Sequence, residues 1–256
     1  MPLVRVRYSA TCGIRTPGKH LMLFYDDLAE FIAKQSEKLQ GLEKANIPEV
    51  GVILDVLRPN DNQDREANPG RHLVTQQVDR LAIDCSGIEG DRHRGLTRLS
   101  TGRETLYKRK GSTIVNRRQI LAVSPYECEL LSERLRVEIT PQLLGANLVI
   151  GRNDGADFCI SDVPLYTHFV IAAADAAAPP QPPVATLVQY LQQKGCSLAG
   201  RAIAKAHEDE KLTQQFVAHA EHHRGILCSV EYPVDSVAFL ERGQKVFFRF
   251  PMGCCY

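Results

Sequence analysis

The sequence predicts a mainly β protein with helical additions (α+β), built as a closed or nearly closed β-barrel with peripheral helices. About eight short apolar runs are separated by turn and loop signals, a spacing typical of all-β architectures. Strands do not alternate regularly with long helices, which argues against a doubly wound α/β sheet. With 256 residues, 44% of them hydrophobic and 24% charged, the chain can bury a full core without disulfide bonds.

Bulk properties exclude several functional classes. The formal net charge is +1, whereas a nucleic-acid-binding domain is usually strongly basic. No apolar run approaches the ~18 to 20 residues that span a bilayer, and the N-terminus lacks the apolar core of a signal peptide. We therefore expect a cytoplasmic protein that binds neither nucleic acid nor membrane. Walker, Gly-x-Gly-x-x-Gly and Gly-x-Ser-x-Gly motifs are absent from the sequence, so nucleotide hydrolysis, Rossmann-type hydride transfer and serine-hydrolase chemistry have no support.

Eight cysteines are scattered along the chain without a Cys-x-x-Cys pair. Their number is even, but the chain is long and shows no secretory signal, so we expect free thiols rather than disulfides. A structural zinc site normally uses paired ligands. The sequence therefore does not predict one.

We divide the chain into an N-terminal extension at 1–47 and a barrel domain at 48–256. Apolar residues at helical spacing in the extension predict a helix at 26–42 that packs outside the barrel. Pro48 introduces a β-rich run, and a polar loop then leads to a strand at 73–84.

The remaining elements follow from local signals. A strand at 113–123 is interrupted by four polar residues, which either face solvent or converge on a pocket. Ser124, Pro125 and Glu127 form a capping box that opens a helix. We expect strand-like runs at 158–173, a helix at 184–195 that ends at Gly195, a helix at about 210–223 and further strands after Gly225 and Gly243.

The stretch from Cys85 to Gly95, CSGIEGDRHRG, is the strongest candidate for a functional site. It contains three glycines, two acids, two arginines and a histidine directly after a predicted strand. Glycine allows positive φ angles and a close approach of the backbone to a ligand, so this loop is suited to hold an anion. The alternative is a solvated turn whose charges pair with each other.

Three sequence words resemble the MOSC domain, named for the C-terminal part of molybdenum cofactor sulfurase. They are GIEGDRHRG in the loop, LLGANLVI at Leu143–Ile150 and HHRGILCSV at His222–Val230. Their order and separations resemble the family over residues 50–248. The resemblance implies the same β-barrel architecture, and it favours a pocket for the polar residues that interrupt the strand at 113–123.

The resemblance also implies a site made of a thiolate and a basic pocket. The family's signature cysteine stands four residues before a Gly-Arg pair, as Cys196 stands before Gly200 and Arg201, although Gly195 replaces the usual preceding proline. A soft metal or sulfane sulfur calls for a thiolate, and a phosphorylated pterin calls for cationic and amide donors. Cys196 is the predicted catalytic residue and metal ligand. The predicted cofactor-binding residues are Arg92, His93, Arg94, Arg118, Asn147 and Arg224.

Two functions follow as alternatives. The first is a stand-alone MOSC protein that binds molybdenum cofactor (molybdopterin) or a related sulfur-bearing metal centre. It would work in redox chemistry or sulfur transfer with a redox or sulfur-donor partner protein, and a homodimer is compatible with the sequence. The second is a non-catalytic anion-binding barrel that has lost its thiol function. It is favoured by Ala146, which replaces the glutamate of the family's Gly-Glu-Asn-Leu turn.

The surroundings of Cys196 distinguish the two functions. A thiol that shares a cavity with His93 and Arg118 supports the first, and a thiol buried among aliphatic side chains supports the second. We predict that the glycine-rich loop faces Arg118 and Arg224. We also predict that Cys196 is the reactive thiol, with Cys85 as its rival, because nearby arginines lower a thiol pKa.

Overall fold

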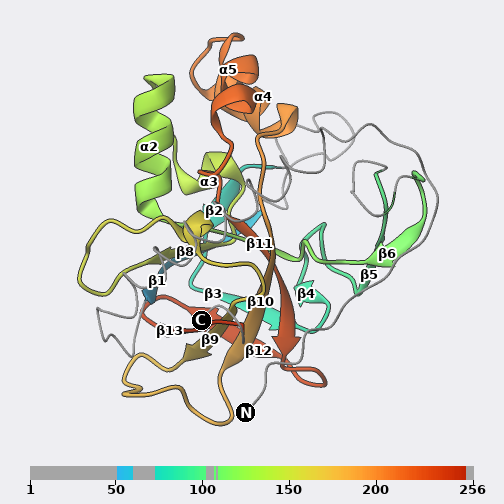
Figure 1. Ribbon diagram of the computed structural model, residues 1–256, viewed down its shortest axis with the longest axis vertical. Coiled ribbons are helices and arrows are strands. Elements are labelled where there is room, and N and C mark those ends of the chain that lie inside the picture. The colour runs from blue at the N-terminus through green and yellow to red at the C-terminus, as the bar shows by residue number, and fades with distance from the viewer. Residues whose placement is uncertain (1–50, 60–72, 102–106, 108, 252–256) are drawn as a thin grey trace, which may run out of the picture.

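Seven strands of the chain close into a β-barrel, as the computed structural model shows (Figure 1). The structure describes residues 51–59, 73–101, 107 and 109–251. The helix predicted at 26–42 and the polar loop at 60–72 lie outside the described residues. The barrel strands are β1 (Gly51–Pro59), β7 (Ile120–Val123), β8 (Leu148–Gly151), β9 (His168–Ala172), β10 (Ala185–Gln192), β11 (Ile226–Tyr232) and β13 (Lys245–Arg249).

The order around the barrel is β13-β9-β10-β11-β7-β8-β1, and pairing of β1 with β13 closes it. Strands β7 and β8 are parallel, and the other neighbouring pairs are antiparallel. Closure leaves no free sheet edge, which is the stable solution for many short strands. The predicted mainly β barrel with helical additions is confirmed.

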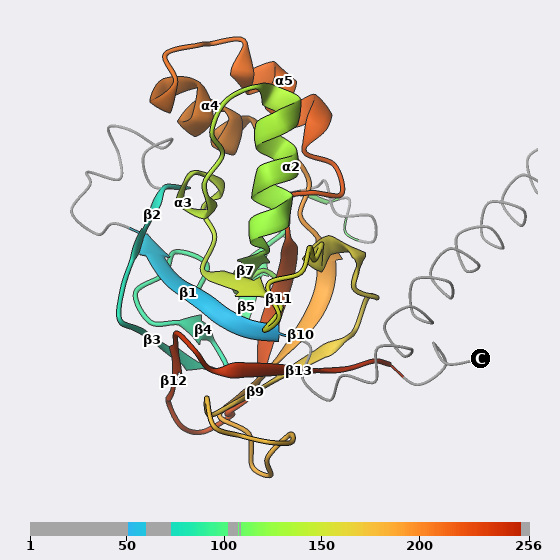
Figure 2. The same cartoon turned by 90° about the vertical axis from the view of Figure 1, so that its left-hand side faces the viewer.

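Smaller sheets lie beside the barrel, and the four α-helices of the described residues gather at one end of it (Figure 2). Strand β2 (Thr75–Gln77) extends the sheet beyond β1, so the strand expected at 73–84 is divided in two. Strands β12 (Ala238–Glu241), β3 (Arg80–Asp84) and β4 (Gly87–Ile88) form one small sheet, and β5 (Thr97–Leu99) pairs with β6 (Thr113–Val115). The helices are α2 (Pro125–Leu135), α3 (Pro141–Leu144), α4 (Ser197–Ala206) and α5 (Leu212–His219).

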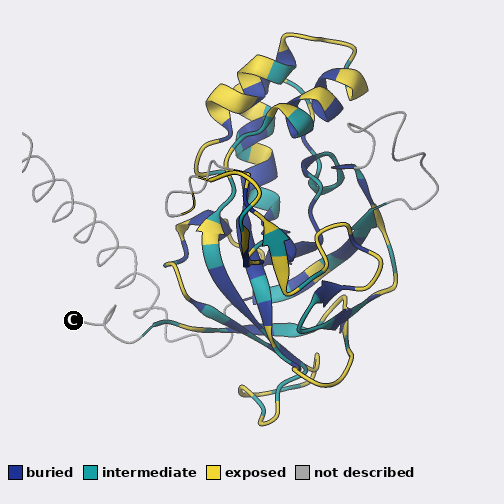
Figure 3. Cartoon of the chain, turned by 90° about the vertical axis from the view of Figure 1, so that its right-hand side faces the viewer, coloured by how far each residue is buried: buried dark blue, intermediate teal, exposed yellow. Residues whose placement is uncertain are grey.

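The barrel wall separates two apolar cores, and side chains alternate between them along β7, β8 and β11. Ile120, Ile226 and Cys228 belong to the core inside the barrel. Leu121 and Leu227 belong to the second core, which contains residues of all four helices. Figure 3 shows exposed residues on the outer surfaces of α4 and α5. None of the described helices is both long enough and apolar enough to cross a membrane.

The capping box predicted at the start of α2 is present. Ser124 Oγ accepts a hydrogen bond from Glu127 N, and the Glu127 carboxylate accepts one from Ser124 N. The interrupted strand is also present, because β6 ends at Val115 and β7 begins at Ile120.

The predicted helix at 184–195 is wrong, because this segment forms β10. It pairs with β9 on one side and β11 on the other. A central strand that is buried on both faces shows little apolar-polar alternation, and short apolar runs of this kind cannot be assigned by periodicity alone. The β-branched Thr186 and Val188 suit the strand.

A helix that the sequence did not predict, α4, begins directly after Cys196. Cys196 therefore caps the start of one helix instead of following the end of another. Gly200 lies inside α4, where a Cβ would come within 2.7 Å of Thr213 O at the start of α5. Glycine at this position lets the two helices pack closely, although it lowers the intrinsic helix propensity of the segment.

Candidate functional site

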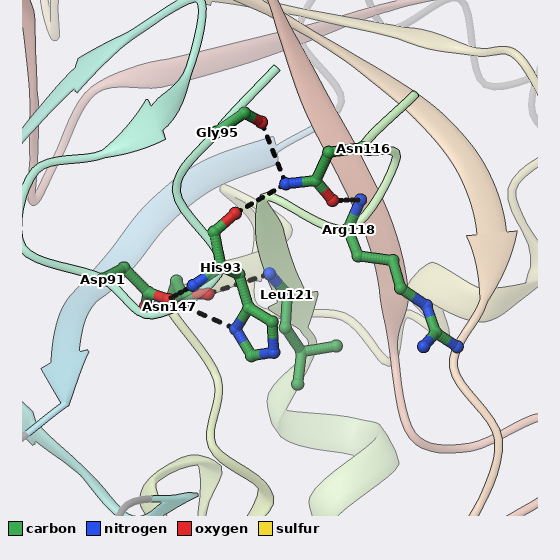
Figure 4. Close-up of polar contacts among 7 residues, drawn as sticks. All are labelled: Asp91, His93, Gly95, Asn116, Arg118, Leu121 and Asn147. Atoms are coloured by element: carbon green, nitrogen blue, oxygen red, sulfur yellow. Dashed lines mark hydrogen bonds and ion pairs between the residues drawn. The ribbon is translucent and has the colours of Figure 1, made fainter. Parts of the chain in front are cut away.

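The glycine-rich loop is anchored by a buried carboxylate, Asp91, whose side chain is 2% exposed. It accepts hydrogen bonds from His93 N at 2.7 Å, His93 Nδ1 at 3.2 Å and Asn147 Nδ2 at 3.2 Å. Asn147 Oδ1 in turn accepts a hydrogen bond from Leu121 N on β7, at 2.9 Å (Figure 4). Burial raises the pKa of Asp91, but the hydrogen bonds from His93 and Asn147 outweigh it and leave this pKa below its ordinary value.

Polar residues between β6 and β7 fix the other side of the loop. Asn116 Nδ2 donates to the carbonyl oxygens of His93 and Gly95, at 2.6 and 3.0 Å. Gln119 Nε2 donates to those of Cys85 and Gly95, at 2.9 and 3.1 Å. These side chains are buried and hydrogen-bonded, which explains how polar groups can interrupt an apolar strand.

Cys196 lies on the helical side of the barrel wall, half-buried against the outer core. Its Sγ accepts a weak hydrogen bond from Ala199 N, at 3.5 Å, in the first turn of α4. The pKa of Cys196 lies below that of an ordinary thiol. Burial acts in the opposite direction, but the positive charge of Arg224, the backbone N–H groups of Leu198 and Ala199 and a hydrogen bond from Arg224 outweigh it.

Arg224 is the most deeply buried cation of the site, at 1% exposure. Its Nη1 donates to Lys194 O at 2.6 Å, and the guanidinium lies 5.5 Å from the centre of the Phe216 ring. Burial lowers the pKa of Arg224, Cys196 raises it, and Arg118 and Arg92 lower it further. Within the described part of the chain, Nε of Arg224 is buried without a hydrogen-bond partner.

Three of the predicted cofactor-binding residues therefore share one electrostatic neighbourhood with Cys196. Arg224 and Arg92 act on the thiol directly, and Arg118 acts on Arg224. Arg92 is exposed and interacts with both Asp91 and Cys196. Figure 4 shows the side chains of His93 and Arg118 extending toward the same side of the loop.

The other three predicted binding residues have partners of their own, and that of His93 is Asp91. Arg94 binds the carboxylate of Asp84, ten residues earlier in the chain. Asn147 holds both Asp91 and the backbone of β7. Sequence reasoning missed Asp91 as the anchor of the loop. An acidic residue two positions before His93 is the spacing of an Asx turn, and this signal was available.

The surface hollows do not indicate which ligand the cluster of Cys196, Arg92, Arg118 and Arg224 would bind. Two small surface hollows, of about 100 and 110 Å³, are lined by neither Cys196 nor the three arginines, although Ile88 and Glu89 of the loop line the second. Among the described residues, no group of three or more His, Cys, Asp or Glu side chains is placed to hold a metal ion. The chemistry of the site therefore rests on one thiol and its surrounding cations.

The chain is similar to proteins of known sequence and structure. YuaD from Bacillus subtilis (strain 168), whose name proposes a role in metal-sulfur cluster biosynthesis, is 35% identical over 165 residues, 64% of this chain and 78% of YuaD. The crystal structure of Bacillus subtilis YuaD superposes with a TM-score of 0.63 at 25% identity and covers 79% of this chain and 97% of that one. YiiM from Geobacillus stearothermophilus gives a TM-score of 0.46 at 13% identity, covering 80% and 78%.

A model of the MOSC domain matches residues 107–246. This span includes β7, β8 and β11, together with Arg118, Cys196 and Arg224. It covers more than half of the chain. The protein therefore belongs to the MOSC domain family.

Proposed function

We propose that this protein handles sulfur at Cys196. It would bind an anionic, sulfur-bearing metal centre, molybdenum cofactor or a related group, and exchange sulfur with a partner protein. The observation that carries this proposal is a half-buried thiol with a lowered pKa beside Arg224 and Arg92. The name of YuaD favours sulfur transfer over redox chemistry.

The residues at the site fit such a centre. A thiolate is a ligand for soft metals and an acceptor of sulfane sulfur. Arg92, Arg118 and Arg224 would hold the phosphate of a pterin, and the buried Nε of Arg224 offers a donor without a partner among the described residues. A metal bound by Cys196 would take its remaining ligands from the cofactor that carries it. When bound, molybdenum cofactor would supply a redox-active metal and sulfur ligands.

Sulfur transfer needs no oxidant or reductant at this site. The Cys196 thiolate attacks the outer sulfur of a donor persulfide and forms a new S–S bond. The S–S bond of the donor breaks, and its electron pair leaves on the inner sulfur as a thiolate. Cys196 then carries the outer sulfur as a persulfide. The lowered pKa of Cys196 raises the fraction of the nucleophilic thiolate.

A non-catalytic anion-binding barrel is the second candidate. Ala146 occupies the position of the family's glutamate and is fully buried, so no carboxylate is available there. The surroundings of Cys196 argue against a purely inert thiol, because the groups that lower its pKa include Arg224 as well as backbone donors.

The test is to purify the protein anaerobically from a molybdenum-replete host and to measure metal, oxidised pterin and sulfur on the Cys196 peptide after exposure to a persulfide. We expect the wild type to retain the metal centre or to gain one sulfur atom at Cys196. Cys196→Ala should do neither while keeping its melting temperature. Equal cofactor retention by both proteins, with no sulfur at Cys196, would support the anion-binding barrel instead.

A further inference from the structure

We propose that Asp91 and His93 form the proton-transfer pair of the thiol site, with His93 Nε2 delivering a proton to the thiolate that leaves the sulfur donor. This inference rests on the proposed sulfur transfer at Cys196. It concerns the leaving group of that reaction. The attacking thiolate needs no base, but protonation by an acid helps a strongly basic thiolate to leave.

The geometry selects one nitrogen of His93 for this role. Asp91 accepts a hydrogen bond from His93 Nδ1 at 3.2 Å, so the Nδ1 position carries a proton and Nε2 is the nitrogen that exchanges one. The carboxylate is 2% exposed, whereas the imidazole is 47% exposed. A buried anion thus orients a ring whose other nitrogen can reach solvent and substrate.

The pair is itself held in place from the barrel wall. Asn147 joins Asp91 to Leu121 N, and Asn116 holds the backbone carbonyl of His93 at 2.6 Å. The carboxylate orients the ring, as a third group orients the base in catalytic pairs generally.

One cation links this pair to the thiol. Arg92 stands between Asp91 and His93 in the sequence and interacts electrostatically with both Asp91 and Cys196. Arg118, in the segment before β7, and Arg92 both act on Arg224, which stands two residues before β11. Through Arg92, the pair is therefore connected to the cations around Cys196.

A purely structural role is the competing explanation. Asp91 Oδ1 accepts a hydrogen bond from His93 N at 2.7 Å, which by itself forms an Asx turn that shapes the loop. The backbone bond does not involve the ring, however, so it does not explain the additional contact with Nδ1. Asp91→Asn separates the two roles, because asparagine keeps the turn but removes the negative charge.

The experiment compares two reactions of Cys196 in the full chain. Sulfur transfer from cysteine persulfide releases a thiolate of high basicity, whereas alkylation by iodoacetamide releases iodide, which needs no proton. We expect His93→Ala and Asp91→Asn to slow single-turnover sulfur transfer to Cys196 by about tenfold to a hundredfold. Alkylation should stay within about twofold of wild type, since His93 is not among the groups that act on the Cys196 pKa.

Two further arms exclude a structural effect. Added imidazole should restore sulfur transfer in His93→Ala, because the ring position is open to solvent. With an aromatic persulfide, whose leaving thiolate is weakly basic, the rate of sulfur transfer should not change on substitution of His93. The matched control is His168→Ala, which removes another histidine-carboxylate pair, with Glu231 at 3.0 Å. It should change neither reaction.

The outcomes separate this inference from the proposed function. If wild-type Cys196 accepts no sulfur, the proposed function fails. If Cys196 accepts sulfur and His93→Ala does so at the wild-type rate, only the proton-transfer role fails. Parallel loss of sulfur transfer and alkylation, without rescue by imidazole, would assign His93 and Asp91 to loop structure alone.

Discussion

Two half-buried cysteines of this protein, Cys196 and Cys159, have thiol pKa values shifted in opposite directions. Burial raises the pKa at both positions and is the largest influence on each. Beside Cys196, a guanidinium and helical N–H groups reverse that effect. Beside Cys159, the carboxylate of Glu127 adds to it. The sign of the neighbouring charge therefore decides whether the thiol pKa lies below or above its ordinary value.

The groups around Cys159 favour the protonated form of its thiol. Its Sγ donates to Glu127 Oε1 at 3.4 Å and lies 3.9 Å from His222 O and from His223 Nδ1. Arg224, which follows His223 in the sequence, interacts instead with Cys196. One short segment, His222–Gly225, thus supplies contacts to both cysteines, and the comparison can be tested by substitutions on either side of it.

The largest expected effect is the difference in reactivity between the two thiols. Each unit of pKa changes the thiolate fraction about tenfold, and the two shifts are opposite. We expect limiting iodoacetamide at pH 7 to label Cys196 faster than Cys159 by a factor on the order of a thousand, measured by peptide mass spectrometry. Guanidinium-unfolded protein is the control, in which the two rates should converge. Labelling of Cys85 or Cys159 ahead of Cys196 would refute the assignment of the reactive thiol.

The next effect concerns the segment that separates the thiols. Gly225 has φ of +80°, and a Cβ there would lie 2.1 Å from Ala122 O. Gly243 has φ of +84° with nothing within 4 Å of its Cβ position. We expect Gly243→Ala to lower the free energy of unfolding by about 1 kcal/mol through backbone strain, and Gly225→Ala by about 3 kcal/mol or more through strain and overlap. Urea denaturation measures both, and equal losses would contradict the predicted steric overlap.

A third effect isolates the cation beside Cys196. Replacing Arg224 with Met removes the strongest influence that lowers the thiol pKa. We expect the alkylation of Cys196 at pH 7 to slow by about tenfold, with the pH-rate profile moved to higher pH. Arg224→Lys should retain part of the effect because it keeps the charge.

The matched control for Arg224 is Arg94→Met. Arg94 is paired with Asp84 and is not among the groups that act on Cys196. It should leave the alkylation rate of Cys196 unchanged. Slowing by both substitutions to the same extent would mean that overall charge, rather than the contact with Arg224, controls the thiol.

The barrel could be predicted from the sequence because local signals and tertiary structure agree over most of it. Turn residues separate the strands, and the capping box at Ser124 marks the start of α2. Prediction failed at β10, where burial on both faces removes the alternation that identifies a strand. It also missed α4, since Cys196 is an unusual N-cap and Gly200 has low helix propensity.

The candidate site was predictable only in part. The family resemblance pointed to Arg92, Arg118, Cys196 and Arg224, which the fold brings into one neighbourhood. The sequence could not predict that Arg94 turns to Asp84, because that choice depends on which side of the loop faces the strand. The contact between Glu127 and Cys159 joins residues 32 positions apart, and local patterns carry no information about such pairs.

The smallest effect tests the carboxylate beside Cys159. Glu127→Gln removes a charge that raises the pKa of Cys159, but burial, the larger cause, remains. The alkylation rate of Cys159 at pH 9 should therefore rise only a few-fold, which corresponds to a decrease of about half a unit in its pKa. The alkylation rate of Cys196 should stay unchanged. Glu129→Gln is the control, since Glu129 is exposed on the same helix and acts on Cys128 instead. An unchanged Cys159 would show that burial alone holds its proton.

The same variant has a pH signature in stability. Burial raises the pKa of Glu127 above its ordinary value of 4.5 despite the hydrogen bonds that it accepts from Ser124 and Ser161. A carboxyl group with a raised folded-state pKa contributes stability that is fully present below pH 4.5 and is lost as the pH rises through the folded-state value. The unfolding free energy of Glu127→Gln, measured relative to wild type by urea denaturation, should therefore increase as the pH rises from 4.5. A relative stability that stays flat or falls over this range would mean that Glu127 is ionised at no cost, and that its hydrogen bonds with Ser124 and Ser161 compensate fully for its burial.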